Sequence, residues 1–426
     1  MTKLANARRV AARVVVDISP LRKYRDYRRL WVGATISALG NQLSIVALAF
    51  EVYRLTRSDF DVGLISLVEL VPCFIGCILG GGIADAMDRR KVLIVTGTVM
   101  AVASAGMALD VGRPHPSLVL LYALAGVAAG FQGANNPAQT AGMLSGVEQA
   151  DIVKANVLRQ LSNQSSVVAG AALGGLVIAW SGVATALWAN TLSFGAVVGA
   201  AIAVGAQRPL GVTRFGWRSI NEGFSFLRER QALRGVFIAD LNVTIFGWPT
   251  SLFPALALTH FHGGARAVGL LYATPGIGAC IGGGLSGWAH RVYRPGIAIC
   301  IGSSVWGLAI ALFGVVPWLP LALGLLGLAG ALDTVCTVFR TAIIQHELPD
   351  RMRGRLSSLQ MALMGNGPRV GNTEAGLVAA ATSTQFSVIS GGIATIVGIA
   401  VVARWTPQFF QFRVGAQAAV VKEAPA

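Results

Sequence analysis

The sequence predicts an all-α integral membrane protein of twelve transmembrane helices, arranged in two pseudo-symmetric six-helix bundles. Hydrophobic residues make up 54% of the 426 residues, charged residues only 12%, and the mean hydropathy is +0.63. This composition leaves too little polar surface to cover a soluble globule. A spanning helix needs about 20 apolar residues, so twelve spans take up roughly 240 residues and leave only short loops.

The distribution of basic residues predicts that both termini are cytoplasmic. Of the 34 lysines and arginines, 28 fall in segments that this topology places in the cytoplasm. Arg54, Arg57, Arg113 and Arg266 fall outside, and Arg340 and Arg369 lie in or near the membrane. This is the positive-inside bias of membrane proteins. The net charge of +15 is therefore explained by topology, and no nucleic-acid partner is expected.

Residues 1–29 read as a basic cytoplasmic tail, because nine basic residues and no long apolar core argue against a cleavable signal peptide. The N-terminal bundle covers residues 30–206. Asn41 and Gln42 lie near the middle of its first span. Their amides either line a cavity or form hydrogen bonds with a neighbouring helix. The first span is expected at about 29–52, and the second begins near residue 62 and ends in the stretch 80–91. The other four are expected at about 92–110, 118–136, 156–180 and 184–206.

A cytoplasmic linker over residues 207–234 separates the two bundles, since it holds six basic and two acidic residues. Trp217, Ile220, Phe224 and Leu227 recur every three or four residues, which predicts an amphipathic helix at the inner interface. The C-terminal bundle covers residues 235–405, and residues 406–426 form a disordered cytoplasmic tail. Its spans are expected at about 235–258, 268–289, 296–316, 319–340, 356–381 and 386–404.

An internal repeat is the third observation behind the fold prediction. With an offset of 202 residues, Gly80 falls on Gly282 and Arg89 on Arg291, whereas Asp85 falls on Gly287. The glycines at 170–175 and at 367–371 match with an offset of 197 residues. Two matched pairs at nearly one offset indicate a duplicated six-helix unit, with a solute bound between the copies near mid-membrane.

The stretch from Gly80 to Lys91 carries the most informative motif. One interpretation is a gating hinge, in which glycines pack against a neighbouring helix and the charged residues make ion pairs in only one of two conformations. The alternative is a basic turn that only fixes topology. The residues assigned to the gating motif are Gly81, Gly82, Asp85, Asp88, Arg89 and Arg90.

This order, Gly-x-x-Ala-Asp-x-x-Asp-Arg-Arg-Lys, resembles the loop between helices 2 and 3 of the major facilitator superfamily. Residues 29–31, 37–40, 52–56 and 62–64, with Pro72, resemble the opening of its enterobactin-exporter-like branch. The resemblance implies a secondary active transporter of the bacterial inner membrane that exports a small amphiphilic molecule, such as a drug, siderophore or metabolite, by alternating access. Proton antiport is expected, although Tyr122 stands where many antiporters of the superfamily carry an arginine.

The resemblance also implies that helices 1, 4, 7 and 10 line the substrate cavity. This nominates Asn41, Gln42, Gln132, Asn135, Asp240, Asn242, Trp248 and Asp333. Ionisable residues within spans are costly, so they are candidates for proton coupling: Glu69, Asp240, Asp333, Arg369 and Glu374. Our hypothesis pairs Arg369 with Asp333 or Asp240 and has protonation release the pair; a static ion pair or a hydrated charge is the alternative.

Several other functions are disfavoured. The chain has no Gly-x-x-x-x-Gly-Lys-Ser/Thr loop, and His346-Glu347 lacks the second histidine of a His-Glu-x-x-His site, so neither an ATP-driven pump nor an enzyme is expected. The five cysteines lie in apolar runs, which predicts neither disulfides nor a metal site. The partners expected are a small-molecule substrate, the lipid bilayer and protons, with a monomeric chain and no cofactor. An uptake carrier, a facilitated-diffusion carrier and a channel stay open.

Overall fold

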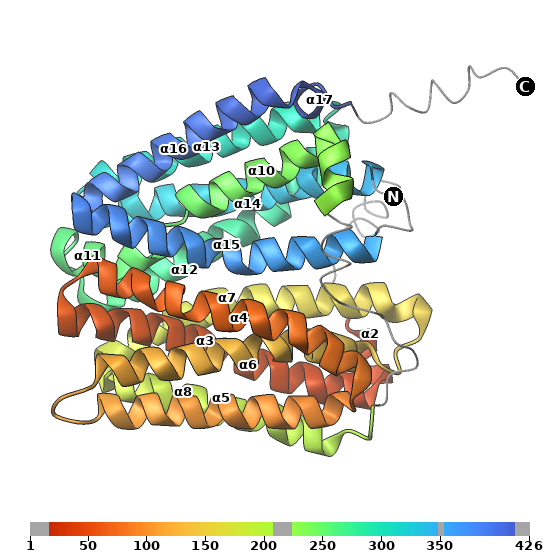
Figure 1. Cartoon of the computed structure of the whole chain (residues 1–426), viewed down its shortest axis with the longest axis vertical. Coiled ribbons are helices and arrows are strands. Elements are labelled where there is room, and N and C mark those ends of the chain that lie inside the picture. The colour runs from red at the N-terminus through yellow and green to blue at the C-terminus, as the bar shows by residue number, and fades with distance from the viewer. Residues whose placement is uncertain (1–16, 208–223, 348–352, 414–426) are drawn as a thin grey trace, which may run out of the picture.

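The computed structural model describes residues 17–207, 224–347 and 353–413. The first half contains six long helices, α3 (Arg25–Thr56), α4 (Asp59–Ala86), α5 (Arg89–Val111), α6 (Leu118–Leu144), α7 (Ile152–Ser181) and α8 (Val183–Ala203). The second half contains α10 (Gln231–Phe246), α12 (Gly264–Leu285), α13 (Pro295–Val315), α14 (Leu319–Glu347), α15 (Arg353–Ala381) and α16 (Thr384–Trp405). The halves form separate bundles stacked one above the other in Figure 1.

The described helices confirm the predicted fold class. Eleven of them are both long enough and apolar enough to cross a membrane, counting α10 with its extension to His260 as one. The twelfth, α15, has 29 residues and runs beside the others, but polar residues such as Arg369 and Glu374 lower its hydropathy. The described chain begins and ends on one side of the bundles (Figure 1), which we call the terminal side.

Each half repeats the same helix pairings, as a duplication requires. In the first bundle α3 packs on α7 and α8, α5 on α6 and α8, and α4 on α6. The corresponding helices of the second bundle pair in the same way, α10 with α15 and α16, α13 with α14 and α16, and α12 with α14. Between the bundles, α4 packs on α15 and α7 on α12. The two bundles are therefore related by a pseudo-twofold arrangement.

Small residues allow the closest helix pair in each bundle to touch backbone to backbone. On α4, a Cβ added at Gly76 would collide with the Gly130 carbonyl oxygen of α6. The equivalent Gly278 of α12 faces the Gly327 carbonyl oxygen of α14 in the same way. Gly80 and Gly282 meet Ala134 and Ala331, so the offset found in the sequence corresponds to one repeated packing contact.

The seventh span is broken where the sequence places Trp248-Pro249. Helix α10 ends at Phe246, a 3-10 turn (Thr250–Leu252) and α11 (Phe253–Ala255) follow, and a π turn (Leu256–His260) completes the span. Proline cannot donate a backbone hydrogen bond, so the helix cannot continue regularly through it. Asn372 of α15 accepts hydrogen bonds from the Ser251 amide (3.0 Å) and the Thr250 hydroxyl (2.8 Å), which compensates for the break.

The N-terminal segment is structured over part of the region predicted as a tail. Helix α2 (Ser19–Lys23) precedes α3, which begins four residues before the predicted boundary. The Lys23 ammonium pairs with Glu148 (2.7 Å), and this hydrogen bond raises the pKa of Lys23. Hydrogen bonds from Ser19 lower the pKa of Asp17 to about 2. These contacts hold residues 17–23 against the turn between α6 and α7.

Two other predicted segments lie partly outside the described residues. Of the linker, residues 224–229 are helical, whereas Trp217 and Ile220 fall in the range 208–223 that the structure does not describe. Of the predicted C-terminal tail, α17 (Pro407–Phe410) is a short helix packed near α10, with Phe409 fully buried. The prediction of disorder is therefore wrong for residues 407–410.

We predict that Gly278→Ala destabilises the protein by about 1–3 kcal/mol, because the new Cβ overpacks the contact between α12 and α14. Gly284→Ala on the same helix is the matched control, since a Cβ there meets nothing within 4 Å. The control should be neutral or slightly stabilising, as expected for removing a helical glycine. Thermal unfolding in detergent measures both, and equal melting temperatures would contradict the packing described here.

Candidate functional site

A cavity of about 520 Å³ lies between the two bundles and is lined by both. From the first bundle, Gln42, Glu69 and Gln164 face it, and from the second, Trp248, Asp333 and Arg369. Proline and glycine also line it, at Pro275 and Gly276 of α12. The volume suits a small organic molecule.

The first bundle contributes a wall of neutral amides. A smaller cavity opens there and is lined by Asn41, Gln42, Gln132, Asn135, Asn136, Gln139 and Asn163, without any charged side chain. Asn135 differs from the other amides, because its side chain is buried and donates a hydrogen bond to the Thr96 hydroxyl of α5 (2.7 Å). The other amides offer both donors and acceptors to a solute.

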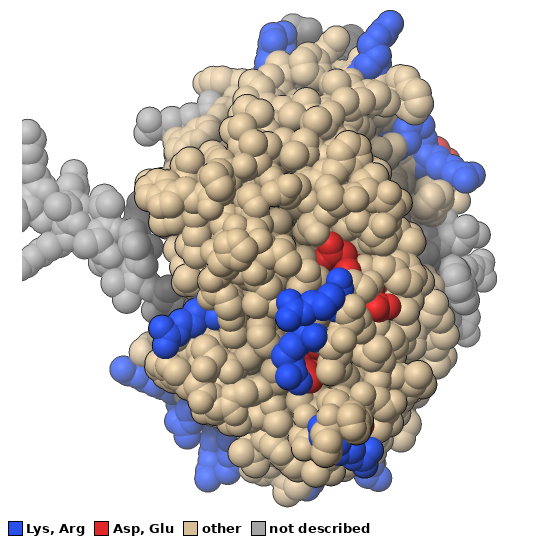
Figure 2. All heavy atoms as spheres, turned by 90° about the vertical axis from the view of Figure 1, so that its left-hand side faces the viewer, with Lys and Arg blue, Asp and Glu red and all other residues tan. Residues whose placement is uncertain are grey.

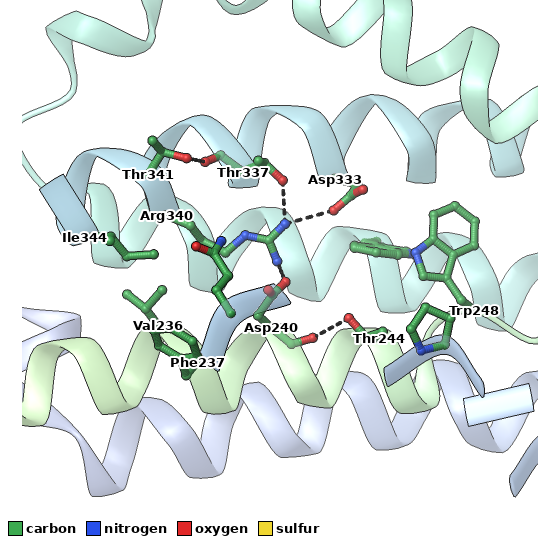
Figure 3. A pocket seen from close by; sticks show the side chains of 13 residues that line it. Val236, Phe237, Asp240, Thr244, Trp248, Asp333, Thr337, Arg340, Thr341 and Ile344 are labelled. Carbon is green, nitrogen blue, oxygen red and sulfur yellow. Dashed lines mark hydrogen bonds and ion pairs between the residues drawn. The ribbon is translucent and has the colours of Figure 1, made fainter. Parts of the chain in front are cut away.

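The second bundle contributes a charged triad of Asp240, Asp333 and Arg340. The Arg340 guanidinium pairs with Asp240 through Nη1 and with Asp333 through Nη2, the latter at 3.0 Å. It also donates to the Thr337 hydroxyl (2.5 Å). Figure 3 shows Arg340 between the two carboxylates, with Trp248 beyond Asp333. The triad and Trp248 border a cavity of about 300 Å³.

A second ion pair crosses from one bundle to the other. Arg369 Nε of α15 donates to Glu69 Oε2 of α4 at 3.3 Å. Sequence reasoning correctly expected Arg369 to meet an acid on another helix, but its two named partners, Asp333 and Asp240, were wrong. Arg340 pairs with both of those acids. It lies seven residues after Asp333 and therefore on the same face of α14, and Asp240 reaches it from α10.

The bundles meet on the side opposite the termini. Gly63 near the start of α4 faces Gly376 near the end of α15, where an added Cβ would lie 3.1 Å from the partner Cα. Gly175 of α7 and Gly269 of α12 approach more closely still, since a Cβ added at Gly175 would lie 2.5 Å from the Gly269 Cα. The Thr384 hydroxyl donates to Asp59 (2.5 Å), which adds a polar contact at the rim. Figure 2 shows this face, where uncharged residues predominate.

The residues assigned to the gating motif contact helix ends of their own bundle. Asp88 caps α5 by accepting from the Arg90 amide (3.0 Å) and also accepts from the Gln207 amide (2.9 Å). Arg89 and Arg90 donate to carbonyl oxygens near the ends of α6 and α8, at 3.3 and 3.1 Å. Gly82 faces open space, Gly81 is buried, and the Asp85 side chain lies outside the described residues.

Two other nominated residues, Asn242 and Glu374, and Tyr122 do not line the cavities described above. Asn242 turns to α16 and donates to the Thr395 carbonyl oxygen (2.9 Å). Glu374 is half-buried on α15, one turn and a half beyond Arg369. The Tyr122 hydroxyl donates to the Asp61 carbonyl oxygen (3.1 Å), a structural contact at the end of α4.

Comparison with known proteins places most of the chain in one family. The sequence profile of the family described as "transmembrane secretion effector" matches residues 16–415. Enterobactin exporter EntS of Citrobacter koseri is 26% identical over 393 residues, which cover 90% of this chain and 93% of the relative. Enterobactin exporter EntS of Escherichia coli O1:K1 is also 26% identical, over 390 residues covering 90% and 92% of the two chains.

Solved structures share the fold at low identity. A bacterial homologue of the human lysosomal transporter Spinster superposes with a TM-score of 0.73 at 14% identity, covering 94% of this chain and 100% of the other. A bacterial homologue of the iron transporter ferroportin gives 0.68 at 15% identity, covering 90% and 98%.

We predict that Asp240→Ala destabilises the protein by about 3–5 kcal/mol, because it leaves the buried Arg340 without its main counter-charge. Asp333→Ala should cost only about 1–2 kcal/mol, since Arg340 keeps Asp240 and Asp333 is partly exposed to the cavity. Thermal unfolding in detergent compares the two variants. A larger effect of Asp333→Ala would contradict this order.

Proposed function

Because the chain belongs to the transmembrane secretion effector family of major facilitator transporters, we propose that it exports a small amphiphilic molecule by alternating access, in exchange for protons. It is a multi-pass membrane transporter and not an enzyme. The observation that carries the proposal is the cavity lined by both bundles and closed by backbone contacts on one side. A rocking motion of the bundles would open that side and close the other.

The distribution of basic residues supports one orientation of the chain in the membrane. We infer that the terminal side faces the cytoplasm of a bacterium, since the basic residues concentrate in the segments on that side. The closed side is then the outer side, so this conformation presents the substrate site to the cytoplasm. Both walls of the cavity come from one chain, so a monomer would be enough to form the substrate site.

The chemistry of the cavity supports an amphiphilic solute. The amides of α3, α6 and α7 can bond hydroxyl, carbonyl or amide groups, and Trp248 offers an aromatic surface. The relatives named enterobactin exporters make a siderophore one candidate for the substrate, beside a drug or another metabolite.

Proton coupling is assigned to the pair that crosses between the bundles. When the outer side opens, Glu69 moves away from Arg369 and can take a proton from outside. Closure returns Glu69 to Arg369, whose positive charge favours the ionised carboxylate and release of the proton. Asp240 and Asp333 stay with Arg340 inside one bundle, so a rocking motion does not separate them. The assignment does not need the helix 4 arginine that Tyr122 replaces.

We expect inside-out membrane vesicles to accumulate a substrate when their interior is made acidic, because the proton gradient then drives export. The assay uses a panel of siderophores and hydrophobic antibiotics with and without a pH gradient. Transport at the same rate with and without the pH gradient would indicate facilitated diffusion. Movement of substrate with the protons, out of the acidic interior, would indicate uptake, and either result contradicts the proposal.

Glu69→Gln should abolish the dependence of transport on the pH gradient, because the amide cannot exchange a proton. Glu374→Gln is the control, since Glu374 does not face Arg369, and it should keep the dependence. Both are measured in the same vesicles with a neutral substrate. Gradient-driven transport that survives in Glu69→Gln would remove Glu69 from the mechanism.

A disulfide across the outer rim should block transport reversibly. The variant Asp59→Cys with Thr384→Cys, in a background without the five natural cysteines, places two thiols where side chains now touch. Oxidation should lower transport by about tenfold or more, because a rigid covalent link prevents the outer side from opening, and reduction should restore it. Each single cysteine variant is a control, and full transport by the oxidised pair would contradict alternating access.

A further inference from the structure

The charged groups around the cavity do not balance. Glu69 and Arg369 form one pair across the bundles, and each group neutralises the other. In the second bundle, however, two carboxylates share a single guanidinium, that of Arg340. When all three groups are ionised, the triad carries one negative charge in a region where water and counter-ions are scarce.

Asp333 is the acid that presents this charge to a solute. Its side chain is 37% exposed, whereas that of Asp240 is 9% exposed and that of Arg340 is 12% exposed. Asp333 borders both the cavity between the bundles and the smaller cavity of the second bundle. Its Oδ1 accepts from Arg340, and its Oδ2 has no hydrogen-bond partner among the described residues. Arg340 is engaged with two acids and Thr337, so it offers little to an anion.

An aromatic surface lies beside this carboxylate. Trp248 borders the same two cavities as Asp333. Its ring packs edge-on against the buried Trp306, with 5.0 Å between ring centroids, which holds the indole in place. Figure 3 shows Trp248 on the side of Asp333 away from Arg340. A carboxylate and an indole that line the same cavity form an arrangement that attracts organic cations.

We propose that Asp333 and Trp248 form the recognition site for a positively charged nitrogen, such as a protonated amine or quaternary ammonium, carried by the transported molecule. This inference rests on the proposed function and specifies its substrate class. The cation would lie between Oδ2 of Asp333 and the Trp248 indole, while the uncharged polar groups of the solute contact the amides of the first bundle. A metal ion fits less well, because no cluster of three or more metal-binding side chains occurs among the described residues.

Two probes of the same shape and opposite charge test the inference without any mutation. The protein, purified in nanodiscs, is dialysed to equilibrium against radiolabelled tetraphenylphosphonium or tetraphenylborate, with empty nanodiscs as the blank. We expect the cation to bind at least about tenfold more tightly than the anion. Equal affinities, or a preference for tetraphenylborate, would overturn the inference.

Variants then locate the site. Asp333→Asn, which keeps the shape and can still accept a hydrogen bond from Arg340, should lower the affinity for tetraphenylphosphonium about tenfold and leave tetraphenylborate unaffected or tighter. Asp333→Glu should restore part of the affinity. Asp61→Asn removes the same charge at the outer end of α4 and should change neither affinity. Cation binding that is unchanged in Asp333→Asn would refute the site.

Transport separates this inference from the proposed function. If vesicles accumulate neutral substrates in response to a pH gradient but the protein does not distinguish the two probes, export stands and the cation site fails. If the protein binds tetraphenylphosphonium through Asp333 but no substrate moves, the cation site stands and the proposed function fails.

Discussion

The cost of placing charge between lipid-embedded helices governs the arrangement of this protein. An ionised side chain at the centre of a bilayer costs about 2.5–3.5 kcal/mol by insertion scales, so each one needs a counter-charge or water. The structure provides the counter-charges in two places, within the second bundle at Arg340 and across the bundles between Glu69 and Arg369. The first lies within a single bundle, whereas the second joins the two bundles.

Duplication explains why the two bundles share packing and yet differ in chemistry. The contacts that bring α4 to α6 and α12 to α14 rest on glycines at equivalent positions, because backbones can approach closely only without side chains between them. The residues that line the cavities are free of this constraint. Neutral amides line the smaller cavity of the first copy, whereas two carboxylates and an arginine line that of the second, so the two bundles carry cavities of different chemistry.

Much of the fold could be predicted from composition, span length and the repeat of glycines, since these reflect the bilayer and the close packing of helices. The site could be predicted only in part. Asn41, Gln42, Gln132, Trp248 and Asp333 line cavities in the structure. The partners of the charged residues could not be derived from helix periodicity alone. Periodicity gives the face of one helix, whereas the choice between Glu69, Asp240 and Asp333 for Arg369 depends on how separate helices are rotated. The pairing of Arg340 with Asp333 could have been predicted from their seven-residue spacing on one helix.

The glycine contacts between the bundles, Gly175 with Gly269 and Gly63 with Gly376, close the side opposite the termini in this structure. An alanine at Gly269 would therefore destabilise this conformation by about 1–3 kcal/mol, because its methyl group would overpack the contact with Gly175. The packing inside each bundle would not change. A bias of that size shifts a two-state population by about 5- to 150-fold. One methyl group at this seam thus offers a simple way to capture the opposite conformation for structural study.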